Sequence, residues 1–153
     1  MVRFFFRLYI YLDDGKIEAA KLDHAQVTQT IAAALTDYEG INLAVPTENM
    51  ATQQGNPLLE QVRRNHHATR SGDIYIIQDP YWFLFDEGPI ASMHGSPWRY
   101  DTHVPIIFSG PKIEAQNVHR LLHPVGVAPT ISALLGMTPP ASAQGSPLQE
   151  VLK

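Results

Sequence analysis

The chain has 153 residues, of which 44% are hydrophobic and 17% charged, and its formal net charge is −4. This composition supports a packed core, and we expect a single domain over 1–153. The acidic balance argues against nucleic-acid binding, which requires clustered Lys and Arg. Because there is no cysteine, disulfide scaffolds, zinc ribbons and thiol catalysis are excluded.

No apolar run approaches the roughly 18 to 20 residues that a membrane span requires, so we expect no span. Arg7 interrupts the apolar segment that follows Met1, and no small-residue cleavage site comes after it. The sequence therefore does not predict a signal peptide.

The first predicted element is one strand over Phe4 to Leu12, because apolar residues recur there at every second position. Its aromatic second face is half apolar, so we expect a complete protein to cover it. Asp13-Asp14-Gly15 predicts a turn. The strand thus predicts a sheet that could also pair with a second chain through its edge.

Two helices and a strand are predicted next. Asp23, with Gln26 in the capping-box position, begins a helix that runs to about Tyr38. We expect its buried face to comprise Val27, Ile31, Ala34, Leu35 and Tyr38. Gly40 suits the left-handed C-terminal position, and a strand over Ile41 to Val45 follows, ended by Pro46. The segment 47–55 predicts an exposed loop, and Asn56-Pro57 begins a second helix whose core face comprises Leu58, Leu59 and Val62.

The later part of the chain predicts strands, a loop and a last helix. The run 73–78 is apolar on both faces and predicts a central strand; 79–80 is a turn, and 81–85 is extended. A long loop opened by 86–89 carries His94, and Val104 to Phe108 predicts a buried strand. The last helix begins at Pro129 and ends at Gly136, and the expected buried residues are Ile131, Leu134 and Leu135. The tail is expected to anchor through Leu148, Val151 and Leu152. Together these elements predict a mixed α/β (α+β) fold with helices packed on a mixed sheet.

Three stretches resemble the alkaline phosphatase superfamily, in particular its two-zinc phosphomonoesterases and its nucleotide pyrophosphatases/phosphodiesterases. The first is the sequence His-Gly-Ser-Pro-Trp-Arg-Tyr-Asp from His94, followed by Val-Pro-Ile-Ile-Phe-Ser-Gly from Val104. The second is Arg-Ser-Gly-Asp-Ile-Tyr-Ile from Arg70, followed by Tyr81-Trp82. The third is Ala-Pro-Thr-Ile-Ser-Ala-Leu-Leu-Gly from Ala128, where Gly126 replaces an aspartate that the family usually carries.

The resemblance implies that His94 is a zinc ligand in a two-metal phosphoryl-transfer site. An ordinary loop histidine bonded to backbone is the alternative for His94. Asp101 is a candidate acceptor for the second nitrogen of the His94 ring, with a loop-stabilising role favoured, and His103 is expected to be structural. The adjacent His66 and His67 are expected to be surface residues.

The nucleophile and the aspartate-rich ligand segments of the family precede the portion matched here, so we expect no catalytic and no cofactor-binding residue in this chain. Asp23-His24 lies at a helix cap in a segment unlike the family's Asp-His metal motif. The resemblance therefore implies the C-terminal portion of a longer zinc-dependent phosphate-ester hydrolase, inactive alone, whose partner is the N-terminal portion. It also implies a periplasmic or extracellular parent, since exported members are common.

Two other interpretations stay open on the sequence. One is a non-enzymatic α+β binding or dimerisation module that associates through an exposed sheet. The other is a fragment of a sulfatase or phosphonate hydrolase, which shares the general metal scaffold. The His-Gly-Ser-Pro-x-x-Tyr-Asp pattern favours phosphate esters as substrates over sulfate esters and phosphonates.

Overall fold

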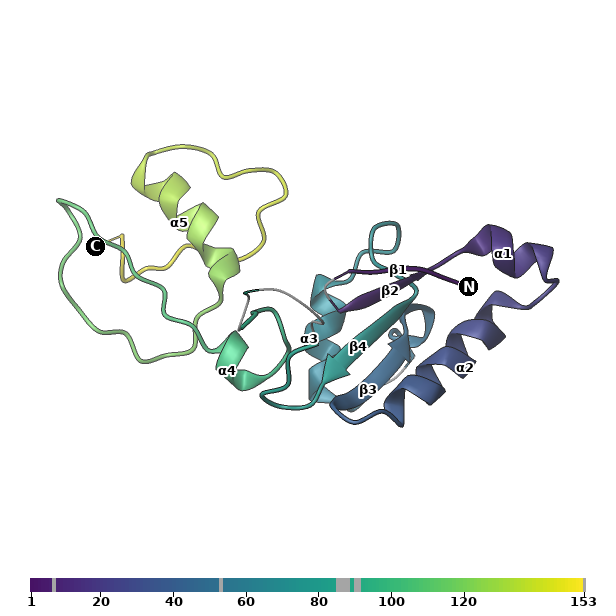
Figure 1. Ribbon diagram of the computed structural model, residues 1–153. Coiled ribbons are helices and arrows are strands. Elements are labelled where there is room, and N and C mark those ends of the chain that lie inside the picture. The colour runs from purple at the N-terminus through teal and green to yellow at the C-terminus, as the bar shows by residue number, and fades with distance from the viewer. Residues whose placement is uncertain (7, 53, 85–88, 90–91, 153) are drawn as a thin grey trace. The chain divides into compact units, whose positions relative to one another are not determined.

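The computed structural model describes residues 1–6, 8–52, 54–84, 89 and 92–152, which form two compact units, Met1–His103 and Val104–Lys153. Each unit is described by itself (Figure 1). The predictions made at Arg7, at Phe85 and for the opening of the long loop at 86–88 lie outside the described residues. Within the described part, no helix is long and apolar enough to cross a bilayer.

The first unit is built on a four-stranded sheet with the order β1-β2-β4-β3. Its strands are β1 (Val2–Phe6), β2 (Tyr9–Leu12), β3 (Ile41–Pro46) and β4 (Ile74–Gln78). Its helices are α1 (Asp14–Ala19), α2 (His24–Thr36), the short 3₁₀ turn η1 (Thr47–Asn49), α3 (Pro57–Asn65) and α4 (Arg99–Thr102). The mixed α+β class is confirmed, and the described strand pairings are antiparallel rather than mixed.

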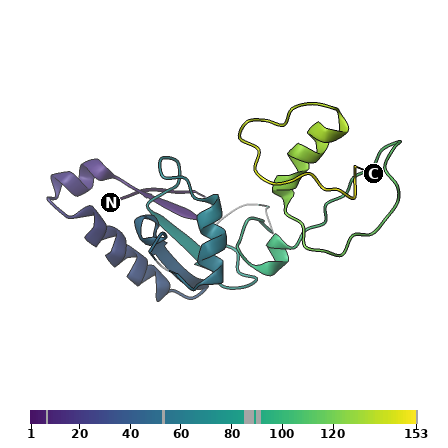
Figure 2. The ribbon, with the colours of Figure 1, turned by 180° about the vertical axis from the view of Figure 1, so that it is seen from behind.

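Strand β4 is the centre of the unit because both of its faces are buried, as its apolar run predicted. Ile74 and Ile76 join a core cluster with residues of α1 and α2, and Tyr75 and Ile77 join a second cluster with residues of α3. The two views in Figures 1 and 2 show α2 and α3 on opposite faces of the sheet. Alternate side chains of one strand therefore hold two helical layers together.

The run predicted as one strand over Phe4 to Leu12 is instead two antiparallel strands, β1 and β2. Phe6 pairs with Tyr9, and Phe5 pairs with Ile10. A period of two is the same in both arms of a hairpin, so the pattern does not show where the chain reverses. The side chains of β1 are exposed, whereas Ile10 of β2 is buried.

Asp or Asn side chains cap the N-termini of α1, α2 and α3. The Asp23 side chain accepts the Gln26 N–H at 2.8 Å, and Asn56 accepts the Leu58 N–H at 3.0 Å, which confirms both predicted caps. Asp13 accepts the Lys16 N–H at 3.1 Å and begins α1, where the sequence predicted only a turn. An Asp-rich turn and a helix N-terminus have the same residue preferences, which explains the difference.

Two packing predictions in this unit need correction. Helix α2 buries Val27, and Ile31 and Leu35 pack against the same core, but Ala34 is exposed. Tyr38 is also exposed, because the helix ends at Thr36. The segment predicted as an exposed loop over 47–55 places Met50 in the core with only 2% of its surface exposed.

The second unit contains the 3₁₀ turn η2 (Pro124–Gly126) and α5 (Val127–Leu134). The predicted buried strand over Val104 to Phe108 is not formed: this run pairs with no described strand, and 82% of Ile107 is exposed. An apolar run shows that a segment can be buried, but a strand also needs a pairing partner. The extended segment expected after β4 likewise forms no strand at 81–84.

Helix α5 buries Pro129 and two hydroxyl side chains, Thr130 and Ser132, instead of the predicted apolar residues. Ile131, Leu134 and Leu135, predicted to be buried, are exposed, whereas Thr130 is fully buried. The Thr130 hydroxyl donates to the Gly126 carbonyl at 2.6 Å and accepts the Leu148 N–H at 2.8 Å. Leu148 is buried, which confirms one predicted anchor of the tail.

Candidate functional site

His94 lies on an exposed stretch of loop, 92–95, that has no helix or strand. The following residue, Gly95, has φ +105°, and a Cβ added there would meet no atom within 4 Å. The backbone beside His94 therefore faces open space rather than an aliphatic core. The imidazole is accessible to a ligand.

The loop is fixed just after His94 by a carboxylate. Asp101 Oδ2 accepts the Ser96 N–H at 2.9 Å and the Ser96 hydroxyl at 2.5 Å. The Asp101 N–H in turn donates to the Trp98 carbonyl at 2.9 Å. Asp101 thus has the loop-stabilising role that the sequence analysis favoured, and it holds the chain two residues from His94.

Trp98 connects this loop to the central strand. Its indole Nε1–H donates to the Gln78 carbonyl, at the end of β4, at 2.8 Å. The ring also packs against the core cluster that contains Tyr75. His103 is exposed directly after α4, and its N–H donates to the Arg99 carbonyl at 2.9 Å. His94 consequently stands on a loop that is attached to the rigid centre of the unit.

The ligand set around His94 is not complete in this chain. Among the residues that the structure describes, no group of three or more His, Asp or Glu side chains could hold a metal ion. A catalytic zinc site usually has three protein ligands. The described residues therefore do not form a zinc site by themselves, and His94 could contribute only one ligand.

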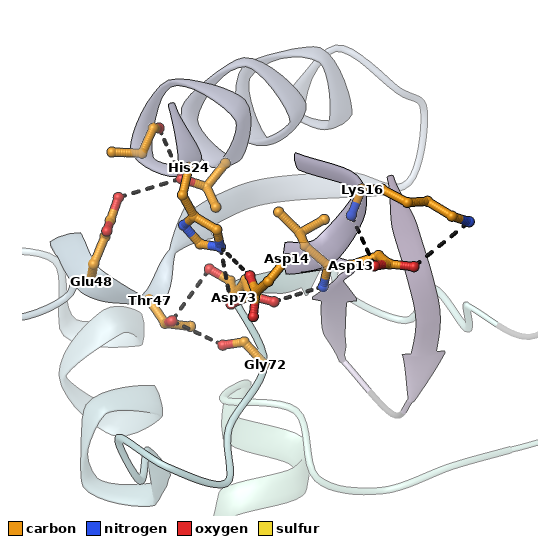
Figure 3. Close-up of polar contacts among 11 residues, drawn as sticks. Asp13, Asp14, Lys16, His24, Thr47, Glu48, Gly72 and Asp73 are labelled. Atoms are coloured by element: carbon orange, nitrogen blue, oxygen red, sulfur yellow. Dashed lines mark hydrogen bonds and ion pairs between the residues drawn. The ribbon is translucent and has the colours of Figure 1, made fainter. Parts of the chain in front are cut away.

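Figure 3 shows a second polar cluster, around His24, that the sequence analysis did not predict. His24 Nε2 lies 3.4 Å from Asp14 Oδ1 and 3.6 Å from Asp73 Oδ1. Asp73 Oδ2 accepts the Leu12 N–H at 2.7 Å. The cluster connects the starts of α1 and α2 to the residue before β4. The sequence did not predict it, because these residues are far apart along the chain.

The role of the His24 cluster is structural. Both ring-to-carboxylate distances exceed those of ordinary hydrogen bonds, so the ring attracts Asp14 and Asp73 chiefly when it is protonated. Asp73 is meanwhile engaged by backbone, and the neighbouring Thr47 hydroxyl donates to the Gly72 carbonyl at 2.9 Å. These contacts hold the end of the 66–73 connection against the helices.

The marked pKa shifts lie away from the His94 loop. Burial raises the pKa of the Tyr75 hydroxyl well above its usual range, and burial also raises the pKa of Tyr9. These two rings pack edge to face at 4.7 Å inside the first unit. In the second unit, the hydrogen bond with Glu150 raises the pKa of Arg120. All three shifts are explained by packing and ion pairing.

Comparison with known proteins identifies the class. The alkaline phosphatase PhoV of Synechococcus elongatus is 29% identical over 145 residues, 94% of this chain and 26% of that protein. A calcium-transporting ATPase of Myroides odoratus is 29% identical over 146 residues, with the same coverage. The crystal structure of the alkaline phosphatase PafA matches with a TM-score of 0.84 at 26% identity, over 95% of this chain and 28% of that one. No protein-family profile matches the chain.

The mixed α+β fold matches the fold of the alkaline phosphatase PafA. The homologues of this chain include alkaline phosphatases, which is consistent with a C-terminal portion of the alkaline phosphatase superfamily, as the three sequence stretches indicated. The chain spans about a quarter of the length of the curated relatives it matches, and it corresponds to their C-terminal part.

Proposed function

We propose that this chain is the C-terminal portion of a zinc-dependent phosphate-ester hydrolase and that His94 is one ligand of its two-zinc site. The observation that carries the proposal is the match to PafA, which covers 95% of this chain but only 28% of the phosphatase. The names of the relatives, alkaline phosphatases and an ATPase, describe enzymes that cleave phosphate bonds. The substrate class therefore includes phosphate monoesters or diesters.

The geometry of the His94 loop supports a ligand role. The imidazole is exposed, and the Ser96–Asp101 hydrogen bonds fix the backbone close to it. A metal ligand needs both properties, since the ring must reach the ion and must hold its position. His94 would hold one of the zinc ions, and the metal would supply stabilisation of the negative charge that develops during phosphoryl transfer.

The rest of the site belongs to the N-terminal portion of the longer protein. That portion would supply the hydroxyl nucleophile and the other zinc ligands. It would also cover the exposed aromatic residues of β1 and the exposed apolar residues of the second unit. Exposed apolar patches of this kind mark surfaces that associate with other chains or segments.

Because the proposed site is shared between this chain and the N-terminal portion, we predict that the chain alone is inactive. We expect the purified 153-residue chain, supplied with zinc, to hydrolyse 4-nitrophenyl phosphate no faster than buffer with zinc, because one histidine cannot retain the metal. A steady-state assay with PafA as the positive control measures this. Saturable turnover by the chain would contradict the division of the site.

A dimerisation module is the second candidate, and the exposed edge strand favours it. Strand β1 lies at the edge of the sheet, and Phe4, Phe5 and Phe6 on it are exposed. An aromatic edge of this kind can pair with a second copy. Hydrolysis of a phosphate ester by the longer protein separates the two candidates, because a dimerisation module predicts none.

A further inference from the structure

A pocket of about 520 Å³ lies within the first unit, between the turn after β4 and helix α4. Its lining combines aromatic and cationic side chains: Pro80, Tyr81, Trp98, Arg99, Tyr100 and His103. Neither Asp nor Glu is among these described lining residues. His94 is not among them either, so the pocket is a feature separate from the proposed zinc ligand.

The aromatic surface of the pocket is a stacked tyrosine pair. The rings of Tyr81 and Tyr100 are 4.8 Å apart with an interplanar angle of 19°. The Tyr81 N–H donates to the Tyr100 hydroxyl at 3.1 Å, which fixes the two residues to each other. Because 84% of Tyr81 is exposed, one face of its ring is open for a further planar group.

The backbone of Tyr81 is strained in the conformation that presents this ring. Its φ is +67°, in the left-handed region that non-glycine residues rarely adopt. Strain of this kind recurs at ligand-binding sites, where the surrounding structure maintains it. A buried packing role does not explain the strain, since the ring is almost fully exposed.

The cationic side of the pocket has no carboxylate partner among the residues that the structure describes. Arg99 and His103 are four residues apart, at the two ends of α4. Among the ion pairs within the described residues, none involves Arg99. Asp101, the carboxylate between them in sequence, accepts its hydrogen bonds from Ser96. The guanidinium is therefore available to an anion.

Part of the pocket lining is held in place by hydrogen bonds. Trp98 is held by its hydrogen bond to the Gln78 carbonyl, and the Ser96–Asp101 hydrogen bonds fix the loop that leads into α4. A site built on such fixed groups loses little conformational entropy when a ligand binds. This rigidity separates the pocket from a chance gap between surface side chains.

We propose that this pocket binds a planar aromatic ring that carries an anionic group, with the ring stacked on Tyr81 and the anion bound by Arg99. Planar rings stack on tyrosine without a requirement for a particular ring, and a guanidinium binds phosphate-like anions through its fork of N–H donors. The proposal does not depend on the proposed hydrolase function, since it concerns binding to this chain without metal.

The test is a titration of the isotope-labelled chain, without metal, followed by NMR. The probes are adenosine 5′-monophosphate, which has both a ring and an anion, adenosine, which has the ring, and ribose 5-phosphate, which has the anion. We expect the monophosphate to shift the Trp98 indole N–H signal in a saturable way. Its affinity should be at least about tenfold higher than that of adenosine or of ribose 5-phosphate. The indole of Trp82, which does not line the pocket, is the internal reference.

Two substitutions test separately the proposed contact of the ring with Tyr81 and the proposed contact of the anion with Arg99. Tyr81→Gly removes the ring and suits the positive φ, so it should fold, and we expect affinity for the monophosphate to fall about tenfold. Arg99→Gln should lower the affinity for the monophosphate several-fold and leave the affinity for adenosine unchanged. Tyr38→Ala, at an exposed tyrosine outside the pocket, is the matched control and should bind normally. Absence of saturation, or equal affinities for Tyr81→Gly and Tyr38→Ala, would overturn the proposal.

Discussion

Gly40 shows how a single residue positions an aromatic side chain near the end of the central strand. Its φ is +87°, and a Cβ added there would lie 2.8 Å from Cδ2 of the Trp82 ring and closer still to Cε3. Its carbonyl accepts the Asp79 N–H at 2.9 Å, directly after β4. Gly40 thus meets two requirements at once, a left-handed backbone and close approach of a ring.

We predict that Gly40→Ala destabilises the chain by about 3 kcal/mol, because it adds a steric clash to the cost of a left-handed alanine. Gly55→Ala is the matched control, since φ is +89° there and an added Cβ would meet no atom within 4 Å. The control should cost about 1 kcal/mol, from backbone strain alone. Urea denaturation of both variants gives the difference, and equal losses would remove the contact with Trp82 from the explanation.

Residues whose role is local were predictable from the sequence. Asp23 and Asn56 cap helices because their side chains reach N–H groups only two or three residues away. Asp101 was favoured as a loop residue for the same reason, and its partner Ser96 is also near in sequence. His24 was not predictable, because its contact with Asp73 depends on how the sheet and α2 pack.

At the scale of elements, a strand is defined by its neighbours as much as by its own residues. Strand β4 was predicted because it is apolar on both faces, and it has a partner on each side, β2 and β3. The run 104–108 is comparably apolar, but it pairs with no described strand and remains irregular. The N-terminal run contains two strands because it can pair with itself as a hairpin.

The attachment of α5 to the tail gives a prediction at this scale. Thr130→Val keeps the side-chain shape but removes the oxygen that accepts the buried Leu148 N–H. Leaving that donor without its acceptor should cost about 2 kcal/mol. We expect the Leu148 amide to exchange with solvent at least about tenfold faster, which hydrogen-exchange NMR measures.

The control for this prediction is Thr30→Val in α2. The Thr30 hydroxyl also donates to a carbonyl four residues earlier, Gln26, at 2.7 Å, but it is exposed. Water can replace that bond, so the substitution should change stability by less than about 0.5 kcal/mol. Unchanged exchange at Leu148 in the Thr130 variant would show that the tail is held by Leu148 packing instead.

At the scale of the whole molecule, each of the two compact units exposes many large apolar side chains. Phe4, Phe5 and Phe6 of β1 are exposed in the first unit, and Ile107 and Leu121 are exposed in the second. The chain spans only about a quarter of the relatives it matches, so we attribute these surfaces to contacts with the remainder of a hydrolase.

The fold class was predictable because strand and helix signals alternate along the sequence, and each depends on nearby residues. For the candidate site, the sequence indicated only His94, because its motif lies within one loop, and the metal role of His94 stays a prediction. The open pocket beside Tyr81 was not predicted, because its lining comes from a turn and a helix that the packing of the unit brings together.

The most direct test of the account is the substitution His94→Ala in the longer protein that contains this chain. We predict that the zinc content, measured by elemental analysis, falls while the fold stays intact. We also predict that kcat for 4-nitrophenyl phosphate decreases by more than about 100-fold, because the loss of a metal ligand should exceed the 10- to 100-fold effects of groups that only orient ligands. His119→Ala, at an exposed histidine outside the His94 loop and the pocket, is the control and should keep both zinc and activity. Normal zinc content and near-normal turnover in the His94 variant would contradict the proposed role.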